Sequence, residues 1–346
     1  MTYDSVLIGS GPINIFEALY LRRKGQKVLI IDEYDRIGGA WATIRHEGLP
    51  DLEIGCHVWD IDARVIEFLT RFLGLDLIPL KPQPKILCGS LRLPYDWKNN
   101  VLFFNRAALP WDRFRLSLVP SKYYYPAGGS AELMAALKRK LQEDGVDVWL
   151  SRRAARIDIK TDRNIVSTAN GAEISCNDTV LTSLSPVEEI TTRSHSFCIR
   201  CRPKQFIHLH LVYAGQLFPR FSYVRVYRDP IIHRISDITS QIARTDRIHH
   251  LGYRVLLVGV YIQPFHAMSR NELIATITRT LKQRRLLSEA ATLVSSYDNV
   301  FTSRQLEQES FETIQRLAPA VRLRRTAYNF TYSIAEQLGR WKDVLR

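Results

Sequence analysis

The sequence has little that would mark a membrane-spanning, disulfide-rich or nucleic-acid-binding protein. Its longest apolar run, Val255 to Ile262, is too short to cross a bilayer. Five cysteines, an odd number in 346 residues, favour reduced thiols over a disulfide framework. Neither an RNP-like segment nor zinc-finger spacing occurs, and no signal-peptide pattern precedes the first predicted strand. We therefore expect a cytoplasmic protein with no transmembrane segment and no nucleic-acid partner.

One cysteine pair raises the question of a metal. Cys198 and Cys201 form a CxxC, and His208 and His210 follow within ten residues, so a Cys2His2 site can be imagined. The histidines, however, alternate with leucines as on a strand, and the chain has no second CxxC. We favour the strand and expect no metal site.

The charge balance is basic. The formal net charge is +13, while the hydrophobic content of 46% and the charged content of 24% are ordinary for a globular protein. The excess could attract an acidic partner such as a nucleotide, an anionic lipid or another protein. A solvated basic surface explains it equally simply, and we favour that reading. Basic residues are concentrated in the C-terminal third, for example Lys282, Arg284, Arg285, Arg316, Arg322, Arg324 and Arg325.

The stretch from Tyr3 to Trp41 has the pattern of a dinucleotide-binding βαβ unit. Tyr3 to Ile8 reads as a buried strand, Ile13 to Lys24 has apolar residues at helical spacing, and Val28 to Ile31 reads as a second buried strand that ends on Asp32. This order of strand, turn, helix, strand and acid is typical of nucleotide-binding folds.

The turn after the first predicted strand is where that unit would bind the phosphates of a dinucleotide. Gly9 permits the tight turn, and Gly11 lets the backbone approach a pyrophosphate at the helix N-terminus. Asn14 stands where a third glycine is usual. Asp32 is placed to accept a hydrogen bond from a ribose hydroxyl.

Asp32 to Trp41, DEYDRIGGAW, resembles the segment that follows the second strand in flavoproteins of the amine oxidase, protoporphyrinogen oxidase, phytoene desaturase and UDP-galactopyranose mutase superfamily. In that family a Gly pair, here Gly38 and Gly39, brings backbone N–H groups to the FAD phosphates. The resemblance implies FAD as cofactor. It implies cofactor contacts from Gly9, Gly11, Pro12, Ile13, Asn14, Asp32, Glu33, Gly38, Gly39, Ala40, Trp41 and Ala154.

Two later segments extend the resemblance. Pro126 to Leu133 matches the family's Pro-x-Gly-Gly-x-x-x-Leu motif, with Ser130 as the expected N-cap of a helix that runs from Ala131 to Glu143. Ala154 lies where the family places a backbone contact to adenine. Asp178 to Pro186 resembles the strand that leaves the FAD domain.

His57 is the catalytic candidate. Gly55 to Trp59 resembles the Gly-x-His-x-aromatic stretch that runs along the flavin ring in the UDP-galactopyranose mutase branch. By that resemblance His57 lies over the isoalloxazine. A structural histidine that is bonded to backbone groups explains the residue equally well.

The predicted fold is α/β: a Rossmann-like FAD-binding domain of the two-dinucleotide-binding-domain type, interleaved with a mixed-sheet and helical substrate domain. Residues 1–60 and 126–188 would form the first, 61–125 and 189–326 the second, and 327–346 a C-terminal return segment. Four predicted strands would floor the substrate site, with Arg225, Arg228 and Arg234 as candidates to face a carboxylate or phosphate. The strands are Phe206 to Tyr213, Phe221 to Arg228, His233 to Ile238 and Arg254 to Tyr261; helices are expected at Asn271 to Lys282 and Thr302 to Leu317.

The family's last FAD segment, a strand followed by Gly-Asp and a helix, is not recognisable, because the chain has no Gly-Asp pair. Three functions follow. The first is an FAD-dependent oxidoreductase that moves a hydride from a small or medium apolar substrate to flavin N5. The second is a UDP-galactopyranose mutase-like nucleotide-sugar enzyme with an anionic substrate. The third is a non-catalytic accessory subunit, and a protein partner could complete the cofactor site.

Overall fold

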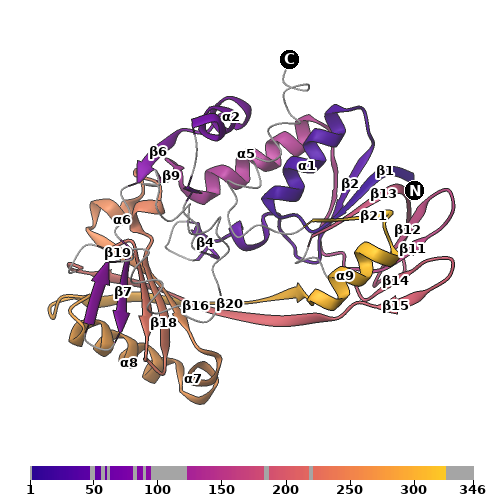
Figure 1. Ribbon diagram of the computed structural model, residues 1–346. Helices are drawn as coiled ribbons and strands as arrows, with labels where there is room; N and C mark the ends of the chain where they lie inside the picture. Colours follow the sequence, from indigo (N-terminus) through magenta and orange to yellow (C-terminus); the bar gives the residue numbers. More distant parts are fainter. Residues whose placement is uncertain are drawn as a thin grey trace.

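The computed structural model describes residues 2–46, 51–55, 59–60, 63–80, 84–88, 91–94, 123–182, 187–217 and 221–324. Two large sheets organise these residues, one around the N-terminal strand and one around the long strands that follow residue 200. Figure 1 shows them side by side, with the first at upper right and the second at lower left. The predicted α/β class, a Rossmann-like unit combined with a mixed sheet, is confirmed.

A parallel core forms the first sheet. Its neighbours run in the order β10, β2, β1, β13 and β21, and each adjacent pair is parallel. The chain passes from β1 to β2 on one side, and β13 lies on the other side of β1. The order of strands therefore reverses at β1. Open α/β sheets bind ligands at the carboxyl ends of the strands beside such a switch point. The bounds are β10 Asp147–Trp149, β2 Val28–Ile31, β1 Thr2–Ile8, β13 Glu173–Thr182 and β21 Val321–Arg324.

Four more strands extend the same sheet beyond the first half of β13, and every pair among them is antiparallel except β11 with β14, which is parallel. The hairpin predicted at Asn170–Gly171 is confirmed, with Gly171 at a φ of +86°. The order continues through β12, β11, β14 and β15. These strands are β12 Asn164–Thr168, β11 Ala154–Ile159, β14 Glu189–Thr191 and β15 Ser196–Cys198.

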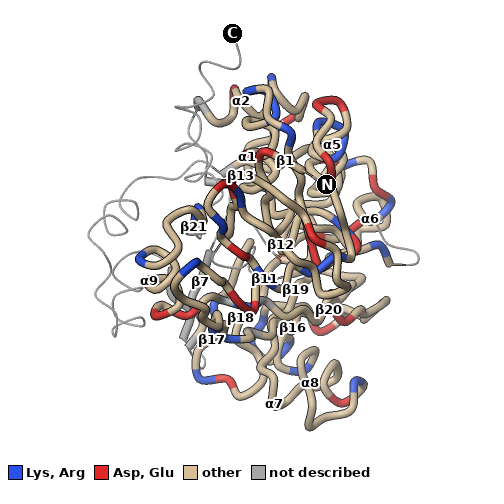
Figure 2. The backbone as a smooth tube through the Cα atoms, turned by 90° about the vertical axis from the view of Figure 1, so that its right-hand side faces the viewer, with Lys and Arg blue, Asp and Glu red and all other residues tan. Residues whose placement is uncertain are grey.

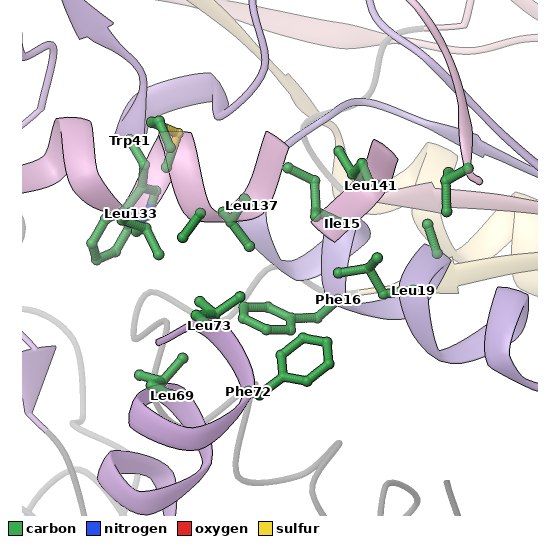
Figure 3. Close-up of a cluster of buried hydrophobic side chains, with 14 of the residues drawn as sticks. Ile15, Phe16, Leu19, Trp41, Leu69, Phe72, Leu73, Leu133, Leu137 and Leu141 are labelled. Carbon is green, nitrogen blue, oxygen red and sulfur yellow. The ribbon is translucent and has the colours of Figure 1, made fainter. Parts of the chain in front are cut away.

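Helices cover both faces of the first sheet. On one face α1 (Pro12–Arg23), α2 (Ala63–Leu73) and α5 (Gly129–Glu143) pack together through Phe16 and Phe72, as Figure 3 shows. On the other, α9 (Gln308–Leu317) packs its buried side chains against Val6 and Ile8. Burial on both faces explains why β1 and β2 read as continuous apolar runs in the sequence.

One face of the second sheet is apolar, and the other combines polar side chains with a smaller buried apolar cluster. Its order is β20, β16, β19, β18, β17, β7 and β8, and α7 (Ile262–Ala267) and α8 (Arg270–Gln283) pack against its apolar face. The paired strands β16 and β20 extend from this sheet toward the first one (Figure 1). The bounds are β20 Thr292–Leu306, β16 Cys201–Ala214, β19 Tyr253–Val260, β18 Ile232–Asp237, β17 Tyr223–Tyr227, β7 Pro84–Cys88 and β8 Leu91–Pro94.

Short elements connect the two sheets. The hairpin β3–β4 follows the 3-10 helix η1, and β5, β9 and β6 form a small antiparallel sheet. Their bounds are η1 Gly39–Trp41, β3 Thr43–Ile44, β4 Leu52–Glu53, β5 Trp59–Asp60, β9 Tyr123–Pro126 and β6 Leu77–Leu80. Two further short helices, η2 (Thr239–Gln241) and α6 (Arg247–His250), lie between β18 and β19 of the second sheet. Within the described residues, no helix is long and apolar enough to cross a membrane. Basic and acidic residues are interspersed over the described elements (Figure 2).

Two local predictions are wrong. Ser130 is not the N-cap of α5: the helix begins at Gly129, two residues earlier than predicted, Gly128 occupies the cap, and Ser130 is buried in the first turn. Gly129 has a φ of +78°, a conformation that a glycine adopts without strain, and this moves the start of the helix. The helix expected from Thr302 begins only at Gln308, because Thr302 to Leu306 pair with β16 and continue β20.

The first sheet draws on more of the chain than the predicted FAD-binding segments. β14, β15 and β21 come from residues assigned in advance to the substrate domain. In particular, β21 pairs with β13 on the side opposite β1, where it completes the parallel core. The domain boundaries themselves remain a prediction, and the predicted return segment 327–346 lies outside the described residues.

Candidate functional site

The turn between β1 and α1 forms the first part of the candidate site. Gly9 has a φ of +94°, and Gly11 is the N-cap of α1, which starts with Pro12 at its first position. A Cβ added at Gly11 would meet no other atom within 4 Å, so the space in front of the turn is open. The N–H groups of Ile13 and Asn14 belong to the first helical turn, which leaves its donors without intrahelical acceptors. This turn can therefore receive an anion.

The second glycine turn packs directly against the first. Gly38 donates its N–H to the carbonyl of Ser10 at 2.9 Å, and a Cβ at Gly39 would lie 3.8 Å from the Cα of Gly11. Gly38 and Gly39 both have positive φ, at +108° and +56°. A Cβ at Gly38 would come within 2.4 Å of the Met134 sulfur in α5, so this position has no room for a side chain. The structure thus unites the two glycine turns that the sequence places about 28 residues apart.

Asp32 lies at the carboxyl end of β2 beside these turns. One carboxylate oxygen accepts hydrogen bonds from the Ser10 N–H and hydroxyl, both at 2.6 Å, and the other accepts from the Tyr34 N–H at 2.9 Å. A carboxylate has about four acceptor positions, so one stays available for a ribose hydroxyl. The side chain is 7% exposed, and its position is fixed before any ligand arrives.

Asn14 holds the turn in place of the missing third glycine. Its amide nitrogen donates to the carbonyls of Ile8 and Gly9, each at 2.9 Å. Its Oδ1 is buried and has no hydrogen-bond partner. A buried acceptor without a donor is uncommon, and here it lies at the helix terminus where the ligand is expected.

The other predicted cofactor residues lie around the same edge. Trp41 is buried in the core beneath η1, and Ala40 precedes it in that helix. Ala154 is the buried first residue of β11, and the segment that leads to it is bonded to the acid loop, because the Arg152 N–H donates to the Asp32 carbonyl at 2.8 Å. Glu33, next to Asp32, is half-buried. His57 lies outside the described residues.

Past η1, the chain makes contact with the second sheet. Glu53 and Ile54, at the end of β4, present their carbonyls to histidines of β16: His210 Nε2 donates to Glu53 at 3.2 Å and His208 Nδ1 donates to Ile54 at 3.0 Å. Asn299 also donates to the Ile54 carbonyl, at 2.9 Å. These bonds fix the segment that follows η1 against the second sheet.

Burial keeps both histidines neutral. Desolvation, assisted by the neighbouring Arg234, lowers the pKa of His208 to about 3. Desolvation, assisted by His46, lowers the pKa of His210 to about 4. The His46 ring stacks on Tyr297 with 4.2 Å between centroids and lies 5.9 Å from the His210 ring. This contact links the end of β3 to the same face of the sheet.

The imagined Cys2His2 site does not assemble. Seven residues of extended strand separate Cys201 from His208, which is about 23 Å. Within the part of the chain that the structure describes, no group of three or more metal-binding side chains occurs. The two histidines instead bond to backbone carbonyls, as the preceding contacts show.

The face of the second sheet opposite α8, which we call the polar face, carries a row of polar side chains. Strand register places Asn299, His208, Gly259, Arg234 and Arg225 side by side across five strands. On β16, β17, β18 and β19, residues that alternate with this row lie in the apolar core beneath α8. Buried polar atoms without hydrogen-bond partners collect on this face: Arg234 Nε and Nη2, Ser236 Oγ and His210 Nδ1.

Sequence reasoning named Arg225 and Arg234 but not the neutral histidines or Ser236 as parts of this face. Arg228, the third predicted arginine, is exposed in the turn after β17 at a φ of +56°. The two-residue alternation of His208 to Leu211 was the available signal for the histidines. Which face they would occupy depended on partners more than 150 residues away, the carbonyls of Glu53 and Ile54.

Comparisons with known proteins agree with this geometry. Residues 7–72 match the family model described as an NAD(P)-binding Rossmann-like domain. A stretch of 103 residues is 28% identical to the soluble pyridine nucleotide transhydrogenase of Sodalis glossinidius (strain morsitans). That match covers 29% of this chain and only 17% of the relative.

Solved structures match over nearly the whole chain. Wild-type putrescine oxidase bound to putrescine has a TM-score of 0.65 at 14% identity and covers 100% of both chains. Reduced UDP-galactopyranose mutase has a TM-score of 0.66 at 12% identity and covers 93% of this chain and 88% of its own. A structure described as a protoporphyrinogen oxidase from Exiguobacterium sp. 255-15 has a TM-score of 0.65 at 14% identity, with 99% and 98% covered.

The fold and the glycine turns define an α/β protein with a Rossmann-like unit and a second, mixed sheet. More specifically, the fold is the one found in putrescine oxidase, UDP-galactopyranose mutase and the protoporphyrinogen oxidase structure. The resemblance to this superfamily, inferred from the glycine motifs, is confirmed at the level of the fold.

Proposed function

We propose that the protein binds FAD and acts as an oxidoreductase of the amine oxidase and protoporphyrinogen oxidase type. The observation that carries this proposal is the contact between the turns at Gly9–Gly11 and Gly38–Gly39. A single glycine turn suits any dinucleotide, whereas the second turn adds backbone N–H groups beside the first. The fold shared with flavin-type oxidases supports the choice of FAD over a nicotinamide cofactor.

The described residues fit the ADP half of FAD. The first turn of α1 would hold the diphosphate through its free N–H groups and partial positive charge. Asp32 would accept a ribose hydroxyl, and the backbone at Ala154 would contact the adenine. The buried Asn14 Oδ1 has no hydrogen-bond donor, so a donor group of the ligand could bind there.

When bound, FAD supplies a hydride acceptor at flavin N5. The protein's share of the chemistry is to bind the substrate, orient it and keep water out. The polar face is the proposed surface on which the substrate lies, because hydrogen bonds to the carbonyls of Glu53 and Ile54 join it to the segment that follows η1. His208 and His210 serve as neutral, rigid parts of that floor, since each donates to a carbonyl. His57 remains the proposed catalytic residue from sequence resemblance alone.

The test compares three outcomes with purified protein. An FAD oxidoreductase binds FAD, and its visible spectrum bleaches when oxidised protein is mixed anaerobically with a substrate. A mutase-like enzyme binds FAD but turns over only with reduced flavin, which stays reduced. An accessory subunit binds no FAD at all, and this result would remove both enzyme assignments.

A further inference from the structure

A cavity of ≈ 510 Å³ lies at one end of the second sheet, beside β6 and α6 (Figure 1). Its walls come from β6, from η2 and α6, and from the ends of β18 and β19 that meet there. None of the described residues that line it belongs to the glycine turns or to the row of the polar face. A cavity of this volume suits a small organic molecule.

The cavity combines an apolar wall with a polar and basic one. Three residues of β6 form the apolar wall: Ile78, Pro79 and Leu80. Hydroxyl and cationic groups from η2, α6 and their flanking segments form the other: Thr239, Ser240, Arg244, His249 and Arg254. A ligand that matches both walls has an apolar body and a polar, negatively charged end.

Two arginines supply the positive charge of this cavity. Arg244 makes no hydrogen bond, ion pair or ring contact with any residue that the structure describes. Arg254 acts on the carboxyl group of Asp237 but forms no ion pair with a described residue. Asp246, between the arginines in the sequence, caps α6 and accepts from the Ile248 N–H at 2.9 Å. Both guanidinium groups are exposed and keep N–H donors for an acidic ligand group.

Among the described residues that line the cavity, Asp237 is the one acid. Its Oδ1 accepts from the Thr239 N–H at 3.0 Å and from the Thr239 hydroxyl at 2.5 Å. The same hydroxyl accepts from the buried Val255 N–H at 2.9 Å, so this wall is held in place before a ligand arrives. Burial raises the pKa of Asp237 and opposes its charged form, although Thr239 and Arg254 act in the other direction. Two cations therefore face one acid that is engaged in the wall.

We propose that this cavity binds a small amphipathic anion, an apolar group that carries one carboxylate or phosphoryl group. The apolar group lies against Ile78, Pro79 and Leu80, and the acidic group lies on the side of Arg244 and Arg254. Apolar burial supplies affinity, and the arginines select the sign of the charge. This inference goes beyond the proposed function, because the residues that line the cavity take no part in the proposed FAD contacts.

The experiment is a calorimetric titration of the purified protein at neutral pH, with FAD in excess. Its probes share one apolar body and differ in charge: phenylpropionate, the neutral phenylpropanamide and the cationic phenylpropylamine. Because the apolar body is constant, differences between these probes report the charge preference of the cavity. Phenyl phosphate is added to compare a phosphoryl group with the carboxylate.

Four variants locate the binding. Arg244→Met and Arg254→Met, singly and together, remove the charge and keep an apolar stem. Ser240→Trp places a large ring at an exposed position of the cavity lining. Arg247→Met is the matched control, because this exposed arginine of α6 is not among the residues that line the cavity. Thermal unfolding shows that each variant is folded.

The expected result is saturable binding of phenylpropionate or phenyl phosphate, about fivefold or more tighter than the amide, with the amine weakest. Each arginine variant should weaken anion binding about two- to fivefold, and the double variant about tenfold. Ser240→Trp should weaken every probe, and Arg247→Met none. The tighter of the two anions identifies the acidic group as carboxylate or phosphoryl.

Three results would overturn the proposal. They are no saturable binding of either anion, binding of the amide or the amine at least as tight as that of the anions, and undiminished anion binding by the folded double variant. An FAD titration of the same samples keeps the two proposals apart. FAD binding without anion binding refutes the cavity site alone, and anion binding without FAD binding refutes the proposed function alone.

Discussion

Ser10 donates two hydrogen bonds to one oxygen of Asp32, from its backbone N–H and from its hydroxyl, both at 2.6 Å. The first residue inside the glycine turn is thereby connected to the acid at the end of the next strand. Both residues are buried. The acid is thus held in position by the turn that would receive the diphosphate, so the ribose and phosphate positions of the candidate site are set by one connected structure.

Replacing Asp32 with Ala should weaken FAD binding by about ten- to a hundredfold, because a charged acceptor contributes roughly 1.5–3 kcal/mol. The measurement is an FAD titration followed by fluorescence quenching. Asp35→Ala is the control, since this exposed acid lies in the same loop and pairs only with Arg36 in the described structure. Equal loss in both variants, or none in either, would contradict the ribose placement.

Gly11 and Gly38 should respond in opposite ways to an added side chain. Gly11→Val projects into open space, so stability should change by less than about 1 kcal/mol while FAD affinity falls at least about tenfold. Gly38→Ala instead meets the Met134 sulfur and an unfavourable φ, and should destabilise the fold by about 2 kcal/mol or more. Chemical denaturation and FAD titration of both variants check this. Full FAD affinity in Gly11→Val would contradict a diphosphate site at the first turn of α1.

Stability should fall as the pH is lowered below the ordinary histidine pKa. The pKa of His208 is about 3 and that of His210 about 4 in the folded protein, against 6.5 when unfolded. The unfolded chain therefore binds more protons, and this stability is fully present above pH 6.5 and lost progressively toward pH 4 and 3. At pH 5 the loss is on the order of 2 kcal/mol for each histidine.

Urea denaturation at pH 7 and pH 5 measures this effect. His208→Asn and His210→Gln, which retain a donor for the Ile54 and Glu53 carbonyls, should each reduce the difference between the two pH values. His250→Gln, a change at an exposed histidine of α6, should leave the difference as in the native protein. A native protein that is equally stable at both pH values would rule out buried neutral histidines.

Arg322 should be needed to hold β21 in the first sheet. It pairs with Glu17 of α1 at 3.0 Å and also with Asp178 of β13. Glu17 is 1% exposed in its side chain, so Arg322→Met leaves a buried charge and should cost about 3 kcal/mol. Arg71→Met, which breaks an exposed pair with Glu67, should cost less than about 1 kcal/mol. Similar small losses in both variants would mean that β21 does not depend on this contact.

The sequence was most informative where local pattern and local structure coincide. The β1–α1–β2 unit follows from apolar runs, glycine positions and a helical repeat within about 30 residues, and its strands are confirmed. The β21 strand was missed because Val321 to Arg324 alternates with arginines and resembles a solvated edge. Its place in the sheet depends on Glu17 and Asp178, the ion-pair partners of Arg322, which lie more than 140 residues away in the sequence.

The polar face depended on register, which composition does not specify. The pairing of Arg225 with Arg234 follows an irregularity between Ile232 and Arg234, where one residue of β18 is unpaired against β19. A shift of one residue would have turned Arg234 toward the apolar core. Sequence reasoning could therefore name the arginines but could not establish that they lie opposite each other.

FAD binding tests the central claim most directly. The purified protein, as isolated and after titration with FAD, should show flavin absorbance that remains with the protein through gel filtration, at about one FAD per chain. Gly11→Val should lose that absorbance while it unfolds at the same denaturant concentration as the native protein. Native protein that carries no flavin and does not retain added FAD would contradict the account.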